Sequence, residues 1–138
     1  MFNIPVLAHV KEVLHTAKTI ALVGFSPKES RPSHMVGCYL MQAGFRVIPV
    51  NPGHSEICGV TCYPDLVSIP VPVDVVDIFR RSEDVMPVVA EAIAIGAKVI
   101  WMQQGIVNHE AAALAEKAGL VVIMDRCIKV DHMQFGSV

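Results

Sequence analysis

The chain has 138 residues, a length typical of a single domain, and 53% of them are hydrophobic while 17% are charged. This apolar content excludes disorder over most of the chain, because enough apolar surface is available to offset the entropy of folding. A net charge of −2 at pH 7 excludes a general nucleic-acid-binding surface. We therefore predict one domain over residues 1–138 that has no nucleic-acid partner.

Charged residues interrupt the long apolar stretches. The longest charge-free stretch, residues 32–45, is too short to span a membrane. The N-terminus lacks the basic patch and the uninterrupted apolar segment of a signal peptide. The sequence thus predicts a cytoplasmic protein with no membrane partner. In that reducing compartment, free thiols are expected for Cys38, Cys58, Cys62 and Cys127.

Strand-like and helix-like segments alternate along the chain. Short apolar runs indicate buried strands, and apolar residues three or four apart indicate helices. Ser33, Ser82 and Asn108 are the predicted N-caps of three of the helices. In chain order we expect a helix over 5–18, a strand over 19–23, a helix over 33–43, strands over 45–50 and 73–79, a helix over 84–95, a strand over 98–102, a helix over 108–118 and a strand over 120–124.

Two segments have no clear period. The proline-containing connection over residues 55–72 is expected to hold a short strand near Val60 and a short helix near Pro64. The tail over residues 125–138 has no predicted element.

Alternation of strands and helices implies right-handed crossovers and a parallel sheet covered on both faces. We predict an α/β fold, a three-layer Rossmann-like doubly wound sheet of about five strands. The expected strand order is 3-2-1-4-5, which places a crevice at the carboxyl ends of the first and fourth strands.

The loop after the first strand is the best candidate site. Residues 24–32 lead into a helix whose N-terminal amides suit a phosphate, with a hydroxyl from Ser26 and a charge from Lys28 or Arg31. An ordinary strand-to-helix turn would use the same residue types for geometry alone. Classical NAD binding is disfavoured, because Asn51 stands where a ribose-binding carboxylate is expected.

Charged and amide side chains follow the third and fourth strands. Arg80 and Arg81 suit a phosphate, or pair with the acids at positions 83 and 84. Gln103 and Gln104 suit an amide-bearing ligand, while Trp101 suits the core.

Motifs for metal binding and catalysis are missing from the sequence. Cys58 and Cys62 have no second pair at zinc spacing, so no metal site is expected. No nucleophile elbow, phosphate-binding lysine motif or H-E-x-x-H motif is present, so no catalytic residue is assigned. Cys127 beside Arg126 is either a thiol of lowered pKa or a structural cysteine.

An ordered series of segments accompanies the predicted strand ends: residues 23–27, 31–33, 47–52, 76–80, 94–98, 101–105 and 124–127. Together they resemble the stand-alone CoA-binding domain proteins of bacteria and archaea, which are similar to the N-terminal CoA-binding domain of the succinyl-CoA synthetase alpha subunit. The likeness extends over about residues 20–129.

The resemblance implies a Rossmann-type fold that binds coenzyme A, with the CoA diphosphate on the first loop. It implies three groups of cofactor-binding residues. Gly24, Phe25, Ser26 and Arg31 would hold the diphosphate; Asn51, Pro52, Gly53 and His54 would flank the adenosine end; Ile78, Phe79, Arg80, Met102, Gln103 and Gln104 would line the pantetheine channel.

Two residues depart from the family pattern. Phe25 replaces a small residue and either packs beneath the loop or obstructs it, and His54 stands where the synthetase subunit has a lysine. The phosphohistidine of the synthetase belongs to a further domain, so no histidine is assigned that role here.

We expect a protein that binds CoA or acyl-CoA, without demonstrated catalysis. One alternative is a small enzyme acting on a nucleotide or acyl-CoA thioester through Cys127 or the Gln103–Gln104 loop. The other is a metabolite or redox sensor that binds a partner protein.

Overall fold

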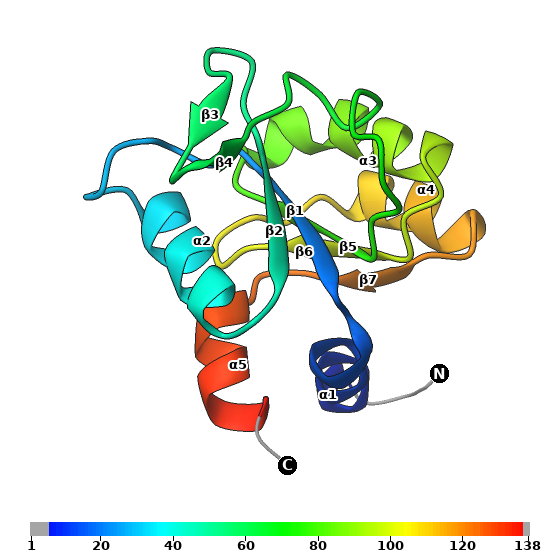
Figure 1. The fold of residues 1–138 in the computed structure, drawn as a ribbon. Coiled ribbons are helices and arrows are strands. Elements are labelled where there is room, and N and C mark those ends of the chain that lie inside the picture. The colour runs from blue at the N-terminus through cyan, green and yellow to red at the C-terminus, as the bar shows by residue number, and fades with distance from the viewer. Residues whose placement is uncertain (1–5, 137–138) are drawn as a thin grey trace.

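A five-stranded parallel sheet forms the centre of the molecule in the computed structural model, which describes residues 6–136 (Figure 1). Pro5, where the leading helix was expected to begin, and residues 137–138 of the tail lie outside the described residues. The predicted Rossmann-like α/β fold is confirmed. The sheet contains β1 (Thr19–Val23), β2 (Arg46–Val50), β5 (Val75–Ile78), β6 (Val99–Met102) and β7 (Val121–Ile123), and the helices are α1 (Val6–Thr16), α2 (Pro32–Gln42), α3 (Val85–Ala94), α4 (His109–Lys117) and α5 (Ile128–Phe135).

The predicted order of the strands is wrong. The observed order is β2-β1-β5-β6-β7, which is 2-1-3-4-5 when the five main strands are counted along the chain. The connection between β2 and β5 therefore carries the chain from one side of β1 to the other. This reversal places the crevice of the fold at the carboxyl ends of β1 and β5, rather than at those of the first and fourth strands.

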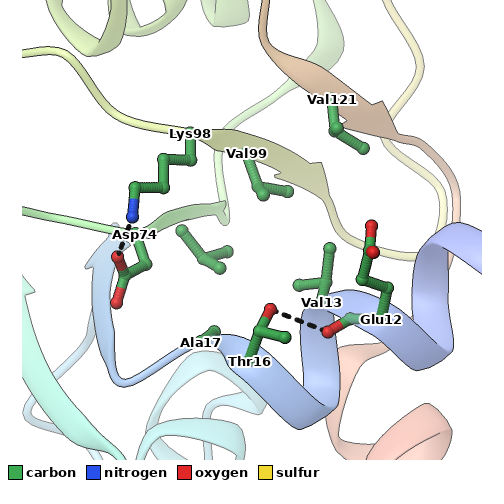
Figure 2. Close-up of a pocket in the computed structure, with 9 residues that line it drawn as sticks. Glu12, Val13, Thr16, Ala17, Asp74, Lys98, Val99 and Val121 are labelled. Atoms are coloured by element: carbon green, nitrogen blue, oxygen red, sulfur yellow. Dashed lines mark hydrogen bonds and ion pairs between the residues drawn. The ribbon is translucent and has the colours of Figure 1, made fainter.

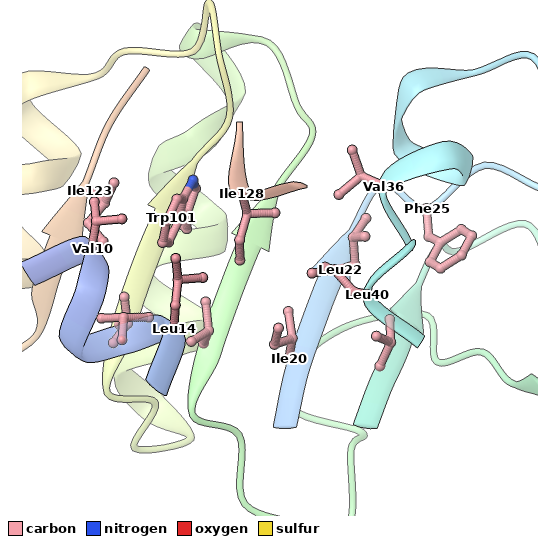
Figure 3. Close-up of a cluster of buried hydrophobic side chains, with 14 of the residues drawn as sticks. Val10, Leu14, Ile20, Leu22, Phe25, Val36, Leu40, Trp101, Ile123 and Ile128 are labelled. Carbon is pink, nitrogen blue, oxygen red and sulfur yellow. The ribbon is translucent and has the colours of Figure 1, made fainter. Parts of the chain in front are cut away.

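Helices cover both faces of the sheet. Side chains of α1, α2 and α5 pack with Ile20, Leu22 and Trp101 in one core cluster (Figure 3), and those of α3 and α4 pack with Ala21 and Val23 in the other. Parallel strands buried in this way are apolar on both faces, which explains the nearly continuous apolar runs of the sequence. Among the described residues, no helix combines the length and the apolar character needed to cross a membrane.

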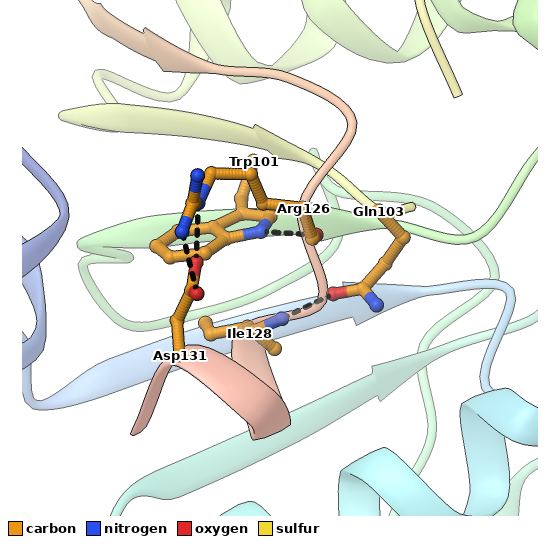
Figure 4. Close-up of polar contacts among 5 residues, drawn as sticks. All are labelled: Trp101, Gln103, Arg126, Ile128 and Asp131. Atoms are coloured by element: carbon orange, nitrogen blue, oxygen red, sulfur yellow. Dashed lines mark hydrogen bonds and ion pairs between the residues drawn. The ribbon is translucent and has the colours of Figure 1, made fainter. Parts of the chain in front are cut away.

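The tail contains a helix that the sequence pattern does not predict. Arg126 donates to both carboxylate oxygens of Asp131, at 2.7 and 2.9 Å, and the Trp101 indole donates to the Arg126 carbonyl at 2.8 Å. The Ile128 amide donates to Gln103 Oε1 at 3.1 Å (Figure 4). Contacts with the end of the sheet therefore fix α5, whose eight residues are too few to show a clear hydrophobic period.

The irregular connection and the helix starts differ in part from expectation. An antiparallel hairpin, β3 (Glu56–Ile57) and β4 (Val60–Thr61), provides the strand expected near Val60, and no helix forms near Pro64. Asn108 caps α4 as predicted, accepting from the Ala111 amide at 2.9 Å. Ser33 and Ser82 are not N-caps: Ser33 lies inside α2, and Ser82 begins the 3-10 helix η1 (Ser82–Asp84).

Candidate functional site

A cleft of about 490 Å³ opens at the reversal point of the sheet. Strands β2, β1 and β5 end in register there, because Val23 lies opposite both Val50 and Ile78. The residues that follow these strands consequently meet at one edge. The cleft is lined by Gly24, Ser26, Arg31, Pro32, Ser33, Asn51, Phe79, Arg80, Arg81 and Ile106.

Glycine is required at the first position after β1. Gly24 has a φ of +91°, and a Cβ atom there would lie 2.3 Å from the Phe79 carbonyl oxygen and 2.9 Å from Arg80 Nη1. The Arg80 guanidinium therefore lies directly beside the backbone of the first loop. This approach brings a cation to the place where the sequence predicts phosphate binding.

Serine hydroxyls shape the rest of the first loop. Ser33 Oγ accepts from the Ser26 amide at 3.0 Å, and Ser26 Oγ accepts from the Lys28 amide at 3.1 Å. Pro32 begins α2, whose N-cap residue Arg31 makes no capping hydrogen bond with its side chain. The positive end of the α2 dipole thus faces the cleft, as expected for an anion-binding loop.

The two arginines after β5 have different roles. Arg81 pairs with Asp84 at 3.1 Å and with Glu83 at 3.8 Å, so its charge is partly neutralised. Arg80 is half-buried and forms no salt bridge with any residue from 6 to 136. A half-buried guanidinium without a carboxylate partner can bind an anionic ligand by donating two parallel hydrogen bonds to it.

Asn51 joins the first loop to the turn after β2. Its amide nitrogen donates to the Phe25 carbonyl at 3.0 Å, and its Oδ1 accepts from the Gly53 amide at 3.0 Å. The side chain that replaces a ribose-binding carboxylate is therefore used to hold two loops together at the wall of the cleft.

The cleft gathers six of the fourteen predicted site residues: Gly24, Ser26, Arg31, Asn51, Phe79 and Arg80. Pro32, Ser33, Arg81 and Ile106 also line it, although they were not among the predicted site residues. Sequence reasoning could have included them, because each belongs to a segment that follows the end of a sheet strand, and such segments line the cleft in this fold.

The other eight predicted residues lie outside the cleft lining. Ile78 and Met102 are fully buried in the core, and the buried Gln103 amide is bonded to the tail. Pro52, Gly53, His54 and Gln104 are exposed. Phe25 is also buried, so it packs beneath the loop and does not obstruct it.

A second hollow, of about 220 Å³, lies at the opposite edge of the sheet beside α1 (Figure 2). Asp74 on its wall accepts from the amides of Lys18 and Thr19 at 2.9 and 3.0 Å and lies 3.5 Å from Lys98 Nζ. Although partial burial opposes the shift, the bonds from Thr19, Lys18 and Lys98 lower the pKa of Asp74. This carboxylate is already satisfied, and it stabilises the junction between α1 and the sheet.

Comparison with known proteins identifies the family. A family model described as a CoA binding domain matches residues 18–133. The uncharacterized protein YneT of Bacillus subtilis is 45% identical, over 93% of this chain and 95% of that protein. The ADP-forming acetate–CoA ligase I of Archaeoglobus fulgidus is 28% identical over 85% of this chain, which spans 18% of the ligase. A solved hypothetical protein from Pyrococcus horikoshii has a TM-score of 0.92 and 40% identity, over 95% of this chain and 92% of that one. The chain therefore belongs to the CoA-binding domain family, as the segments at its strand ends predicted.

Proposed function

We propose that this protein binds CoA or an acyl-CoA in the cleft between β1 and β5, as a binding module without chemistry of its own. The observation that carries the proposal is the position of Arg80, which lies beside Gly24, lines the same cleft as the N-terminus of α2 and forms no salt bridge within residues 6–136. A diphosphate between the arginine and the helix would meet positive charge on both sides. The family match supports CoA as the source of that diphosphate.

The remaining walls fit the two ends of the same ligand. Asn51 borders the side proposed for adenosine, and Phe79 with Ile106 supplies apolar surface for the pantetheine arm. Adenosine contacts from Pro52, Gly53 and the exposed His54 would extend this wall beyond the cleft. The buried Ile78, Met102 and Gln103 would support the channel from behind, with no direct contact with the ligand.

Calorimetry with CoA, NAD and ATP tests the proposal. We expect CoA to bind more tightly than NAD or ATP, and the Arg80→Ala variant to bind CoA about 10- to 100-fold more weakly, because a charge-assisted hydrogen bond contributes about 1.5–3 kcal/mol. Arg46→Ala is the matched control, since Arg46 carries the same charge at the opposite edge of the sheet. Tight binding of NAD without CoA, or equal CoA affinity in both variants, would refute the proposed site.

A further inference from the structure

Two thiols and an imidazole meet outside the cleft, between α2 and the β3–β4 hairpin. His34 and Cys38 are four residues apart on α2, and Cys58 comes from the turn of the hairpin. Cys38 Sγ lies 3.6 Å from Cys58 Sγ, which lies 3.7 Å from His34 Nε2. The potential ligand atoms of all three residues lie within 4.8 Å of one another.

Two of these separations, between the two sulfurs and between Cys58 Sγ and His34 Nε2, match the edges of a tetrahedral metal site. Zinc binds sulfur at about 2.3 Å and imidazole nitrogen at about 2.0–2.1 Å, which places neighbouring ligand atoms about 3.5–3.8 Å apart. A disulfide would instead need the two sulfurs to be about 2.05 Å apart, and it would leave the nearby imidazole without a role. The Cys38–Cys58 and Cys58–His34 pairs therefore have the spacing of ligands around a common ion, and all three side chains lie close enough to share one.

The histidine ring is oriented for binding through Nε2. His34 Nδ1 lies 2.8 Å from the carbonyl oxygen of Ser26, a distance at which Nδ1–H donates to that oxygen. The lone pair is then on Nε2, which faces Cys58. Metal-binding histidines are commonly oriented by such a hydrogen bond from the second ring nitrogen.

The hairpin presents Cys58 at a conformational cost. Cys58 and Gly59 form a two-residue turn with positive φ at both positions, +54° and +77°. Such turns favour asparagine followed by glycine, and a cysteine in the first position is strained. The turn places an exposed thiol against Cys38 of α2, whereas the neighbouring Cys62 is buried and donates to the Asn51 carbonyl instead.

We propose that His34, Cys38 and Cys58 form a binding site for a transition-metal ion of the zinc class, with a fourth position open to water or an external ligand. Both thiols lose their protons to the solvent, so the two thiolates balance the charge of a divalent ion. Two thiolates, one imidazole and an open position are a known zinc ligand set. The sequence pattern missed this site because Cys58 comes from a different element and Cys62, its partner in the sequence motif, lies elsewhere.

Metal titration under reducing conditions tests the site without any use of CoA. The wild-type protein is expected to bind one Zn²⁺ per chain, measured by competition with a chromogenic chelator. Co²⁺ in its place should give a thiolate-to-metal charge-transfer band. Cys58→Asn, which suits the turn but lacks the thiol, should bind at least about 100-fold more weakly, because each zinc ligand supplies a large share of the binding free energy. Cys127→Ser, which removes a cysteine outside the cluster, should bind like wild type.

Three outcomes would overturn the inference. These are no Zn²⁺ binding by the reduced wild-type protein, equal Zn²⁺ affinity in Cys58→Asn and Cys127→Ser, and a Co²⁺ spectrum without a thiolate band. A Cys38–Cys58 disulfide on air oxidation, combined with no metal binding after reduction, would identify a redox pair instead. None of these results depends on whether the cleft binds CoA.

Discussion

Replacement of Asp77 by valine is expected to raise the free energy of unfolding by about 2–4 kcal/mol at pH 7, because an isolated carboxyl group in an apolar core is costly whether it is ionised or protonated. Asp77 lies in the central strand β5, in register between Leu22 and Trp101, and it is 0% exposed. Neither of its carboxyl oxygens has a hydrogen-bond partner among residues 6–136. Valine removes the unpaired polar atoms and favours strand conformation.

The same carboxyl group gives the protein an unusual dependence on pH. Burial raises the pKa of Asp77 well above its ordinary value. Between the unfolded pKa of about 3.9 and the raised folded pKa, the folded protein holds a proton that the unfolded chain has released. The pH-dependent part of the cost of Asp77 is therefore absent below about pH 4, and the free energy of unfolding falls as the pH rises toward the folded pKa, by about 1.4 kcal/mol per pH unit.

Urea unfolding of the wild type, Asp77→Val and Asp77→Asn over a range from about pH 4 to pH 8 separates these effects. In both variants the free energy of unfolding should no longer fall with pH because of residue 77. The valine variant should be the more stable of the two, because asparagine keeps buried polar atoms. Parallel stability curves for wild type and Asp77→Asn would show that Asp77 has an ordinary pKa in the folded protein.

The existence of the main strands could be predicted from sequence, but their order could not. Each strand is a short apolar run bounded by turn residues, so each is recognisable alone. All five runs are similarly apolar, and nothing within a run records its neighbours. The position of β5 beside β1 depends on the path of the connection from β2, where the sequence shows only prolines and turns.

The candidate site also contains some residues whose position could be predicted from sequence and others whose position could not. Gly24 and Arg80 could be placed at the cleft from sequence, because Gly24 directly follows β1, Arg80 comes two residues after the end of β5, and the cleft forms where those strands end. Gln103 also follows a strand, yet its amide is buried against Ile128 in a tail with no recognisable helix. Ser33 precedes a helical pattern and was predicted as a cap, but its hydroxyl accepts from Ser26 across the loop. In both cases a tertiary partner determines what the side chain does.

The proposed metal site of His34, Cys38 and Cys58 could be predicted from sequence only in part. His34 and Cys38 are four residues apart in a predicted helix, so their common face could be recognised. Cys58 reaches them only because the β3–β4 hairpin folds back over α2, a contact between elements that sequence spacing does not encode.

Phe25 and Gly37 form a complementary pair that holds the first loop of the cleft. A Cβ atom at Gly37 would lie 2.2 Å from Cε2 of the buried Phe25 ring. The ring thus fills space that only a glycine in α2 leaves open, and the Phe25 carbonyl is bonded to Asn51 at the cleft. The bulky residue that departs from the family pattern is accommodated by the helix.

A double-mutant cycle should reveal this pairing in stability. Phe25→Ala is expected to cost about 3–5 kcal/mol through the cavity it leaves. Gly37→Ala alone should cost about 1–3 kcal/mol by overpacking, although alanine normally favours a helix by about 1 kcal/mol over glycine. In the Phe25→Ala background the clash is gone, so Gly37→Ala should stabilise the protein there. The two effects of Gly37→Ala therefore differ in sign, and urea unfolding of the four proteins measures both. An equal cost of Gly37→Ala in the two backgrounds would mean that the ring does not pack against α2, and that the loop of the cleft is held in some other way.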